Sequence, residues 1–313
     1  MRVITRKPWL TGIAALATVC LAVAAAAWLS TPSPLQLQRR VDGRLQQAHG
    51  TPIPLVRVSP LLREAVVATE DERFYRHRGI DLVGIIRAIP FDLTHLSLAE
   101  GASTITEQTA KLLYLGGNDH TIWRKLEDAA LAVKLESRYE KEQILDAYLN
   151  SVYFGEGATG VYAASERFFG IAPARLDLAQ ASLLAGLIQA PAAYDPALHP
   201  LAARERQLDV LRSLVRDGFT TQEEAADAAG TPLPVRTGRP LPVIHGVDFR
   251  PGPAFVWGEL SAGAAILVAA IAGLVAVRRL KISKPLPRIG IELALVVVLL
   301  IAGAAVIRSF RVL

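Results

Sequence analysis

Three long apolar runs interrupt the mixture of polar and apolar positions along the chain. The first extends from Leu10 to Leu29 without a charged residue, and two more cover residues 260–277 and 289–307, where Glu292 is the single charge. A helix rises about 1.5 Å per residue, so each run is long enough to cross a hydrocarbon core of about 30 Å. We therefore predict one N-terminal and two C-terminal transmembrane helices, over residues 9–29, 257–277 and 289–307.

Basic residues flank these runs on one side. Three of them precede the first run, and residues 278–288 hold five Lys and Arg between the other two runs. By the positive-inside rule, residues 1–8 and 278–288 are expected in the cytoplasm, and residues 30–256 and the short tail 308–313 on the outer side. A cleaved signal peptide at the N-terminus and two buried core helices near the C-terminus are the alternatives to this topology.

Between the membrane segments, apolar residues recur at helical spacing and the breaks fall at capping residues. Ser59-Pro60 is typical of a helix start, Thr104-x-x-Glu107 of a capping box, and Thr121 of an N-cap. Alternating β-branched runs, which would indicate strands, are almost absent. The expected helices cover residues 59–71, 81–89, 104–115, 121–138, 141–150, 177–189, 200–217 and 221–229.

These helices predict a mainly α domain over residues 59–229. The polar residues 30–58 before it are interpreted as a stalk. Residues 230–256 after it are rich in Pro and Gly, which indicates a linker into the second membrane segment.

Composition and charge narrow the classes of function. With 51% hydrophobic residues, the chain is too apolar to be disordered. Its net charge is +5, yet residues 31–256 contain 24 of the 34 Lys and Arg against 27 of the 29 Asp and Glu. The positive excess therefore flanks the membrane segments, and nucleic acid is not expected as a partner. The single cysteine, Cys20, lies in a membrane segment, so no disulfide is expected in the outer domain.

Four short segments carry the residue types of a polar active site. Taken singly, each has a structural explanation: a solvated acidic cluster, a helix start, a salt-bridged helix face and a turn. The segments are Glu70-Asp71-Glu72-Arg73-Phe74 with His77 and Gly79; Gly101-Ala102-Ser103-Thr104-Ile105-Thr106-Glu107-Gln108 with Lys111; Arg124-Lys125-Leu126-Glu127-Asp128; and Tyr148-Leu149-Asn150 before a glycine-rich stretch.

Together, in this order and at this spacing, the four segments resemble the peptidoglycan glycosyltransferase family, found in monofunctional transglycosylases and in class A penicillin-binding proteins. The resemblance extends from Val67 to Ala229. It implies a lysozyme-like helical fold that polymerises lipid II at the outer face of a bacterial cytoplasmic membrane. The growing glycan strand would be the donor, and attack by an incoming lipid II would invert the anomeric carbon and release polyprenyl diphosphate. Residues 82–98 match the membrane-dipping lobe of the family, so membrane lipid is an expected partner.

The same resemblance assigns roles to individual residues. Glu70 holds the position of the catalytic base, which accepts the proton of the attacking hydroxyl. Lys111 and Arg124 hold positions, with Lys125 beside them, where cations stabilise the leaving diphosphate. The further substrate-binding positions, on the polar helix start, are Ser103, Thr104, Glu107 and Gln108.

Three positions depart from the family pattern. Asp128 stands where the second catalytic carboxylate is normally a Glu, and the neighbouring Glu127 points about 100° away on a helix. Glu107 replaces a glutamine, and His120, a further substrate-binding candidate, stands where a phosphate-binding Arg is common. We expect Asp128 to take the role of the second catalytic carboxylate, orienting Glu70 or the cations. A catalytically impaired scaffold that binds lipid II is the alternative that these departures favour.

Other classes of function are less compatible with the residues. The region after residue 230 lacks the Ser-x-x-Lys, Ser-x-Asn and Lys-Thr-Gly motifs of a transpeptidase, so we expect a monofunctional enzyme with separate transpeptidases as partners. A lytic glycosidase has no diphosphate to hold with cations, and a channel would need a charged pathway. No cofactor is expected to be required and no metal-ligand cluster is visible, although a divalent cation such as Mg²⁺ could bridge the diphosphate and Asp128.

Overall fold

The computed structural model describes residues 8–85, 103–116 and 121–233 and positions 235, 236, 241, 243, 247 and 249, with side chains from Thr18 onward. The chain divides into two compact units, of which residues 27–82 and 100–251 form the one with the helical domain. Several predictions fall outside the described residues: His120, residues 86–98 of the lobe, and the segments 257–277, 278–288 and 289–307.

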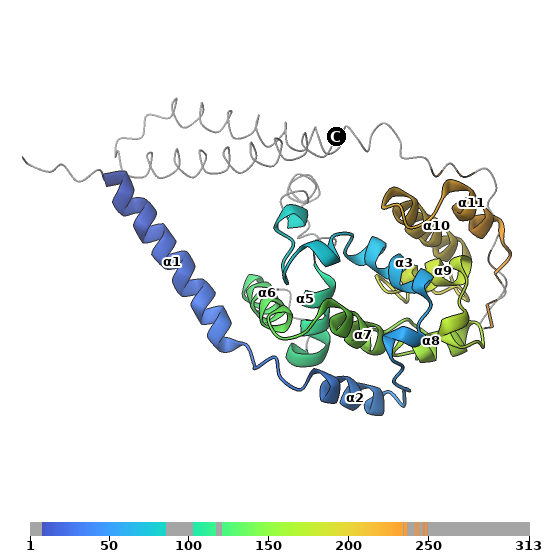
Figure 1. The fold of residues 1–313 in the computed structure, drawn as a ribbon, viewed down its shortest axis with the longest axis horizontal. Coiled ribbons are helices and arrows are strands. Elements are labelled where there is room, and N and C mark those ends of the chain that lie inside the picture. Colours follow the sequence, from blue (N-terminus) through green and yellow to red (C-terminus); the bar gives the residue numbers. More distant parts are fainter. Residues whose placement is uncertain are drawn as a thin grey trace, which may run out of the picture. The chain divides into compact units, whose positions relative to one another are not determined.

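The prediction of a mainly α domain is confirmed (Figure 1). Within the described ranges no β-strand forms, and strand-like pairing is limited to the isolated bridges Arg78–Ile80 and Tyr153–Thr159. The α-helices are α1 (Pro8–Ser30), α2 (Leu37–Gln47), α3 (Pro60–Glu70), α5 (Ile105–Ala110), α6 (Ile122–Glu136), α7 (Lys141–Ser151), α8 (Val161–Phe168), α9 (Leu178–Leu187), α10 (Pro200–Arg216) and α11 (Gln222–Gly230). Short 3₁₀ turns are η1 (Leu55–Arg57), η2 (Phe74–Arg76) and η5 (Pro173–Arg175), and η4 (Lys111–Leu115) is a π-helical turn.

The predicted caps explain where most helices begin. Thr104 and Glu107 exchange both bonds of a capping box at α5, and Thr121 accepts a hydrogen bond from the Arg124 N–H at the start of α6. Ser59 precedes α3 as predicted, but its hydroxyl donates to the carbonyl of Leu176 instead of capping the helix. Capping boxes also begin α9, at Asp177 and Gln180, and α11, at Thr221 and Glu224.

Two helices are additional to those expected from the sequence, α2 and α8. In α2 the apolar residues Leu37, Val41 and Leu45 recur every fourth position and are buried in one cluster with Leu131 of α6 and Ala147 of α7. The polar residues between them dominate the composition of segment 30–58, which is why the sequence indicates a stalk there. The structure thus adds a helix that packs on the domain.

The core is built around α9, which lies beside α10 and α3 (Figure 1). Its residues are almost all small or apolar, and most are fully buried, including Leu183, Leu184 and Leu187. A helix that is apolar on every side is stable only when neighbours cover it completely. Through α3, this buried helix fixes the segment that ends in Glu70.

The predicted N-terminal membrane segment coincides with α1. In the part of the chain whose side chains are described, no helix is both long and apolar enough to cross a membrane. The transmembrane topology stays a prediction.

The C-terminal end of α1 is held against α6 by hydrogen bonds. The Lys134 ammonium donates to the Thr31 carbonyl at 3.0 Å and the Thr31 hydroxyl at 2.8 Å, and it lies 4.9 Å from the centre of the Trp28 ring. Nearer the start of α6, Glu127 accepts a hydrogen bond of 2.9 Å from the Ser30 hydroxyl. The end of α1 and the residue after it are therefore hydrogen-bonded to α6.

The turn that follows α3 depends on Gly79, which has a φ of +83°. A Cβ atom built at this position would lie 2.7 Å from the Val133 nitrogen and 2.8 Å from the Ala132 carbonyl carbon, both in the backbone of α6. Only glycine allows this close approach together with a left-handed backbone.

We predict that Gly79→Ala lowers the free energy of unfolding by about 3 kcal/mol, from left-handed strain and overpacking together. Gly218 is a matched control, because its φ is +76° and a Cβ atom at this position would meet nothing within 4 Å. Gly218→Ala should cost only about 1 kcal/mol. Denaturant unfolding of the purified protein, followed by circular dichroism, measures both, and equal losses would contradict the close approach to α6.

Candidate active site

Glu70 is the last residue of α3, and its half-buried carboxylate faces α5. The Gln108 side-chain amide of α5 donates to Glu70 Oε2 at 2.8 Å. Burial raises the pKa of the Glu70 carboxyl, while the bond from Gln108 and the charge of Arg206 act in the opposite direction. A carboxyl with a raised pKa at a helix end is suited to accept a proton near neutral pH.

The turn after Glu70 is tied to the start of α5 by Asp71. Its carboxylate accepts a hydrogen bond of 3.0 Å from the Ile105 backbone N–H and lies 2.9 Å from His77 Nε2. The Thr104 hydroxyl also donates to the Gly79 carbonyl, at 2.7 Å. Through these contacts His77 and Gly79 take part in the structure of the turn.

The start of α5 carries four of the predicted substrate-binding residues, and a fifth reaches it from α6. Thr104 and Glu107 are buried in the capping box, where Glu107 Oε2 accepts from the Thr104 backbone N–H at 2.8 Å. Lys125 reaches this helix start from α6: its ammonium contacts the Ser103 hydroxyl and lies 3.9 Å from Glu107 Oε2. Gln108 points to the other side, towards Glu70. Burial raises the pKa of the Glu107 carboxyl, and Lys125 is the largest opposing influence.

The second predicted carboxylate, Asp128, is buried on α6 and pairs with Arg124. The Arg124 Nε atom donates to Asp128 Oδ1 at 3.2 Å, and the same guanidinium donates to the carbonyls of Leu115 and Gly116. Burial raises the pKa of the Asp128 carboxyl, against the charges of Arg124, Lys125 and Lys111. The charge of Lys111, on η4, has the smallest of these effects on the pKa of Asp128.

Glu127 faces a different part of the molecule. Its Oε1 atom accepts hydrogen bonds from the Ser30 hydroxyl and from the Trp123 indole, at 2.9 and 3.0 Å. Of the two acidic neighbours on α6, Asp128 is the one that lies among the cations.

The candidate site combines a carboxyl of raised pKa on α3 with a carboxylate beside cations on α6. Both lie within the part of the chain that matches a known family. The sequence profile described as Transglycosylase matches residues 37–215, more than half of the chain. The chain belongs to the transglycosylase family.

Individual relatives agree with this assignment. A protein of Cupriavidus necator named "Putative transglycosylase" is 40% identical over 184 residues, which cover 59% of this chain and 79% of that protein. Penicillin-binding protein 1A of Aquifex aeolicus is 42% identical over 172 residues, covering 55% of this chain and 24% of the relative. Penicillin-binding protein 2D of Bacillus subtilis is 37% identical over 203 residues, covering 65% and 28%.

The similarity is confined to part of the longer relatives. The chain spans about a quarter of the length of the penicillin-binding proteins it matches. The resemblance predicted from the motifs is confirmed, and this transglycosylase chain matches the profile from residue 37, so that α2 lies inside the matched region. Among solved structures, penicillin-binding protein 1A of Haemophilus influenzae is 19% identical over 70% of this chain and 21% of that chain, with a TM-score of 0.34, which is too low to support a structural argument.

Two residues that hold members of the candidate site in place do not stand out in the sequence. Asp71 is there only a neighbour of Glu70, and Tyr148 only part of a motif. Tyr148 is fully buried on α7, and its hydroxyl donates to Gln108 Oε1 at 2.9 Å. Asp71 bonds to Ile105, 34 residues away in the chain, and Tyr148 bonds to Gln108, 40 residues away. No local pattern therefore indicates either residue.

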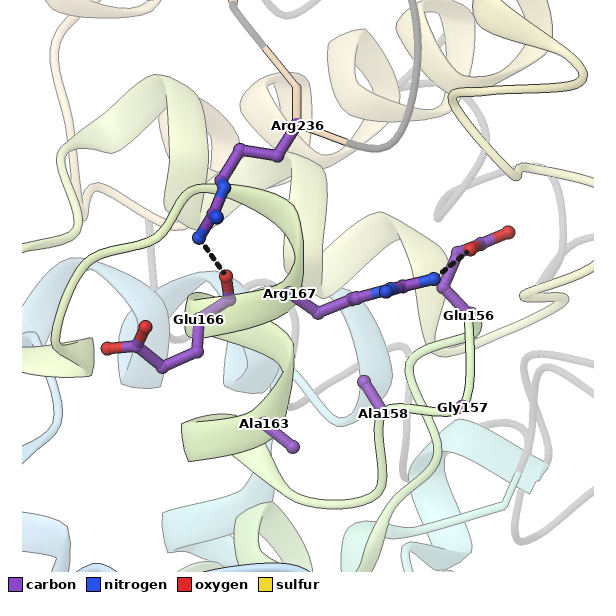
Figure 2. A pocket seen from close by; sticks show the side chains of 7 residues that line it. All are labelled: Glu156, Gly157, Ala158, Ala163, Glu166, Arg167 and Arg236. Carbon is purple, nitrogen blue, oxygen red and sulfur yellow. Dashed lines mark hydrogen bonds and ion pairs between the residues drawn. The ribbon is translucent and has the colours of Figure 1, made fainter.

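A recess of about 610 Å³ lies elsewhere in the transglycosylase domain, between α8 and the loop before it (Figure 2). Its guanidinium groups have partners of their own: Arg167 pairs with Glu156 at 3.0 Å, and Arg236 donates to the Glu166 carbonyl at 3.3 Å. None of the predicted site residues lines it, so it is not the candidate active site. The lining residues are Glu156, Gly157, Ala158, Ala163, Glu166, Arg167 and Arg236.

We predict that Glu107→Gln makes the protein more stable at about pH 8 than the wild type, with the difference vanishing near pH 4. The variant keeps an oxygen for the Thr104 N–H and removes a buried charge. Because the folded-state pKa of Glu107 is raised, its contribution to stability is full at low pH and is lost as the pH rises. Thermal unfolding across this pH range measures the effect.

Glu224 is the matched control, because it forms the same capping box on α11 but is exposed. Hydrogen bonds from Thr221 lower its pKa, so its contribution is present at high pH and is lost on acidification. Glu224→Gln should therefore have the opposite sign at about pH 8. Two variants that respond alike would refute the role of burial at Glu107.

Proposed function

We propose that this transglycosylase polymerises lipid II into glycan strands, by inverting transfer with release of polyprenyl diphosphate. The observation that carries the proposal is Glu70, a half-buried carboxyl with a raised pKa that Gln108 holds at 2.8 Å. In the reaction, Glu70 accepts the proton of the 4-hydroxyl of the incoming lipid II as that oxygen attacks the anomeric carbon of the growing strand. The bond from the anomeric carbon to the diphosphate oxygen breaks at the same time.

Cations for the leaving diphosphate are present on η4 and α6. Half of the Lys125 side chain is exposed, at 51%, so its ammonium can reach an anion outside the domain. Arg124 pairs with Asp128 at 3.2 Å, and the charge of Lys111, on η4, lowers the pKa of the same carboxyl. We assign to Asp128, as the second carboxylate, the role of orienting Arg124 and balancing the positive charges. It is therefore a positioning residue.

The exposed apolar residues of α6 are compatible with a substrate that has a lipid tail. Ile122, Trp123 and Leu126 are exposed at the start of this helix, with 72% of Ile122 accessible, next to the cations Arg124 and Lys125. Apolar side chains beside basic ones are typical of a surface that meets the headgroup region of a bilayer. The proposed location is the outer face of the bacterial cytoplasmic membrane, with the predicted transmembrane helices as anchors and separate transpeptidases as partners for cross-linking.

The proposed mechanism assigns the charge of the diphosphate to Lys and Arg and requires no cofactor. The Asp128 carboxylate is buried against the Arg124 guanidinium. A divalent cation such as Mg²⁺ at the diphosphate is compatible with this assignment, because Mg²⁺ is commonly held by one or two carboxylates together with substrate phosphates.

We predict that the purified full-length protein converts labelled lipid II into long glycan and that Glu70→Gln does not. The rate should rise with pH through a pKa above the usual glutamate range, because the base must be ionised and burial opposes its ionisation. Gel separation of the labelled products across a pH series measures both effects. Binding of lipid II without any product from the wild type would instead favour the scaffold.

The two neighbouring acids on α6 provide a second prediction. Asp128→Asn should slow polymerisation at least about tenfold, because the Arg124 guanidinium loses its charged partner. Glu127→Gln should leave the rate close to that of the wild type, since Glu127 contacts Ser30 and Trp123. Initial rates with labelled lipid II compare the two, and the reverse order of effects would show that Asp128 is not the second carboxylate.

A further inference from the structure

Three side chains from three helices form a chain of hydrogen bonds that ends at Glu70. The Tyr148 hydroxyl on α7 donates to Gln108 Oε1 at 2.9 Å, and Gln108 Nε2 on α5 donates to Glu70 Oε2 at 2.8 Å. Tyr148 is 0% exposed, and Gln108 is the hydrogen-bond partner that the described residues provide for its hydroxyl. The arrangement makes the orientation of one amide group important for the base.

A side-chain amide has a donating end and an accepting end, and the ionised Glu70 carboxylate can only accept. The observed orientation places the NH₂ group against Glu70, which stabilises the ionised form. If the amide turned by 180°, its oxygen would face Glu70, and only the protonated carboxyl could bond to it. The two orientations of Gln108 therefore correspond to two protonation states of Glu70.

Tyr148 distinguishes between these orientations. In the observed one, its hydroxyl proton has an acceptor in Gln108 Oε1. In the reversed one, the hydroxyl oxygen would accept from the amide, but the hydroxyl proton would be buried without an acceptor, which is unfavourable. Burial and the charges of Glu70 and Asp71 raise the pKa of Tyr148 well above its usual range, so the proton stays on the hydroxyl.

We infer that Tyr148 is a positioning residue whose hydroxyl fixes the amide of Gln108 so that its NH₂ group faces Glu70 and keeps this base ionised. The inference rests on the proposed role of Glu70. Two other charged groups act on the same carboxyl, Asp71 beside it and Arg206 from α10, and neither is changed in the variants below.

Tyr139 gives a matched control for the loss of a tyrosine hydroxyl. Its hydroxyl accepts a hydrogen bond of 3.3 Å from the Leu37 backbone N–H and has no bond to Gln108 or Glu70. Tyr139→Phe should therefore affect stability without affecting the titration of Glu70.

The direct test is an infrared titration of the full-length protein in detergent, using the carboxyl band that disappears in Glu70→Gln. Tyr148→Phe should raise the midpoint of this band by about half a pH unit to one unit, and Tyr139→Phe should not move it. In a Gln108→Met background, Tyr148→Phe should cause no further shift, because the amide that it orients is absent. An unchanged midpoint in Tyr148→Phe, or an equal shift with and without Gln108, would overturn the inference.

A second variant covers the case in which Tyr148→Phe does not fold. Incorporation of 3-fluorotyrosine at position 148 keeps the ring and the hydroxyl but makes the proton a stronger donor. The midpoint of Glu70 should then move down, whereas a role in packing alone would leave it unchanged.

The pH dependence of polymerisation completes the test. The acidic limb of kcat/KM should move with the infrared midpoint in Tyr148→Phe, while the rate on the high-pH plateau stays near that of the wild type. A wild-type protein that forms no glycan would refute the proposed function, but the infrared midpoints would still decide the role of Tyr148.

Discussion

The geometry of the site depends on one buried carboxylate, that of Asp71. Both of its oxygens lie 2.9 Å from His77 Nε2, and Oδ2 also accepts from the first backbone N–H of α5, so the end of α3 and the start of α5 share one charged group. A charge-assisted bond to a free N–H at a helix start is stronger than a neutral one and favours a fixed geometry. Glu70 lies one residue before Asp71 and Gln108 three residues after Ile105, so their meeting at 2.8 Å follows from this junction.

The helices could be predicted where the information is local. The box of Thr104 and Glu107 and the cap at Thr121 indicate α5 and α6, because both partners of each bond lie within one turn. In contrast, the only apolar stripe of α2 is Leu37, Val41 and Leu45. These residues are buried by helices from other parts of the chain, so the sequence of α2 alone does not predict that it packs on the domain. A similar distinction applies to the candidate site: Glu70 and the cations are candidates because their motifs resemble those of a known family, whereas contacts such as that of Tyr148 with Gln108 join residues 40 apart.

The site also concentrates carboxyl groups that would each be better solvated in water. Burial raises the pKa values of Glu70, Glu107 and Asp128, and each of them therefore opposes folding as the pH rises. Carboxyl groups with shifted pKa values are expected at functional sites, where a loss of stability is tolerated because the shifted pKa is used in the reaction. The hydrophobic core around α9 provides the compensating stability.

The π-helical turn η4 makes the site sensitive to the number of residues in this segment. Its closing bond runs from the Gly116 N–H to the Lys111 carbonyl, five residues back, so the turn holds one residue more than an α-turn. The carbonyls of Leu115 and Gly116 at its end hold the Arg124 guanidinium. Loss of one residue here would let the backbone close as an ordinary helix, yet it would rotate these carbonyls by about 100°. The arginine thus makes this segment intolerant of a deletion that the helix alone would accept.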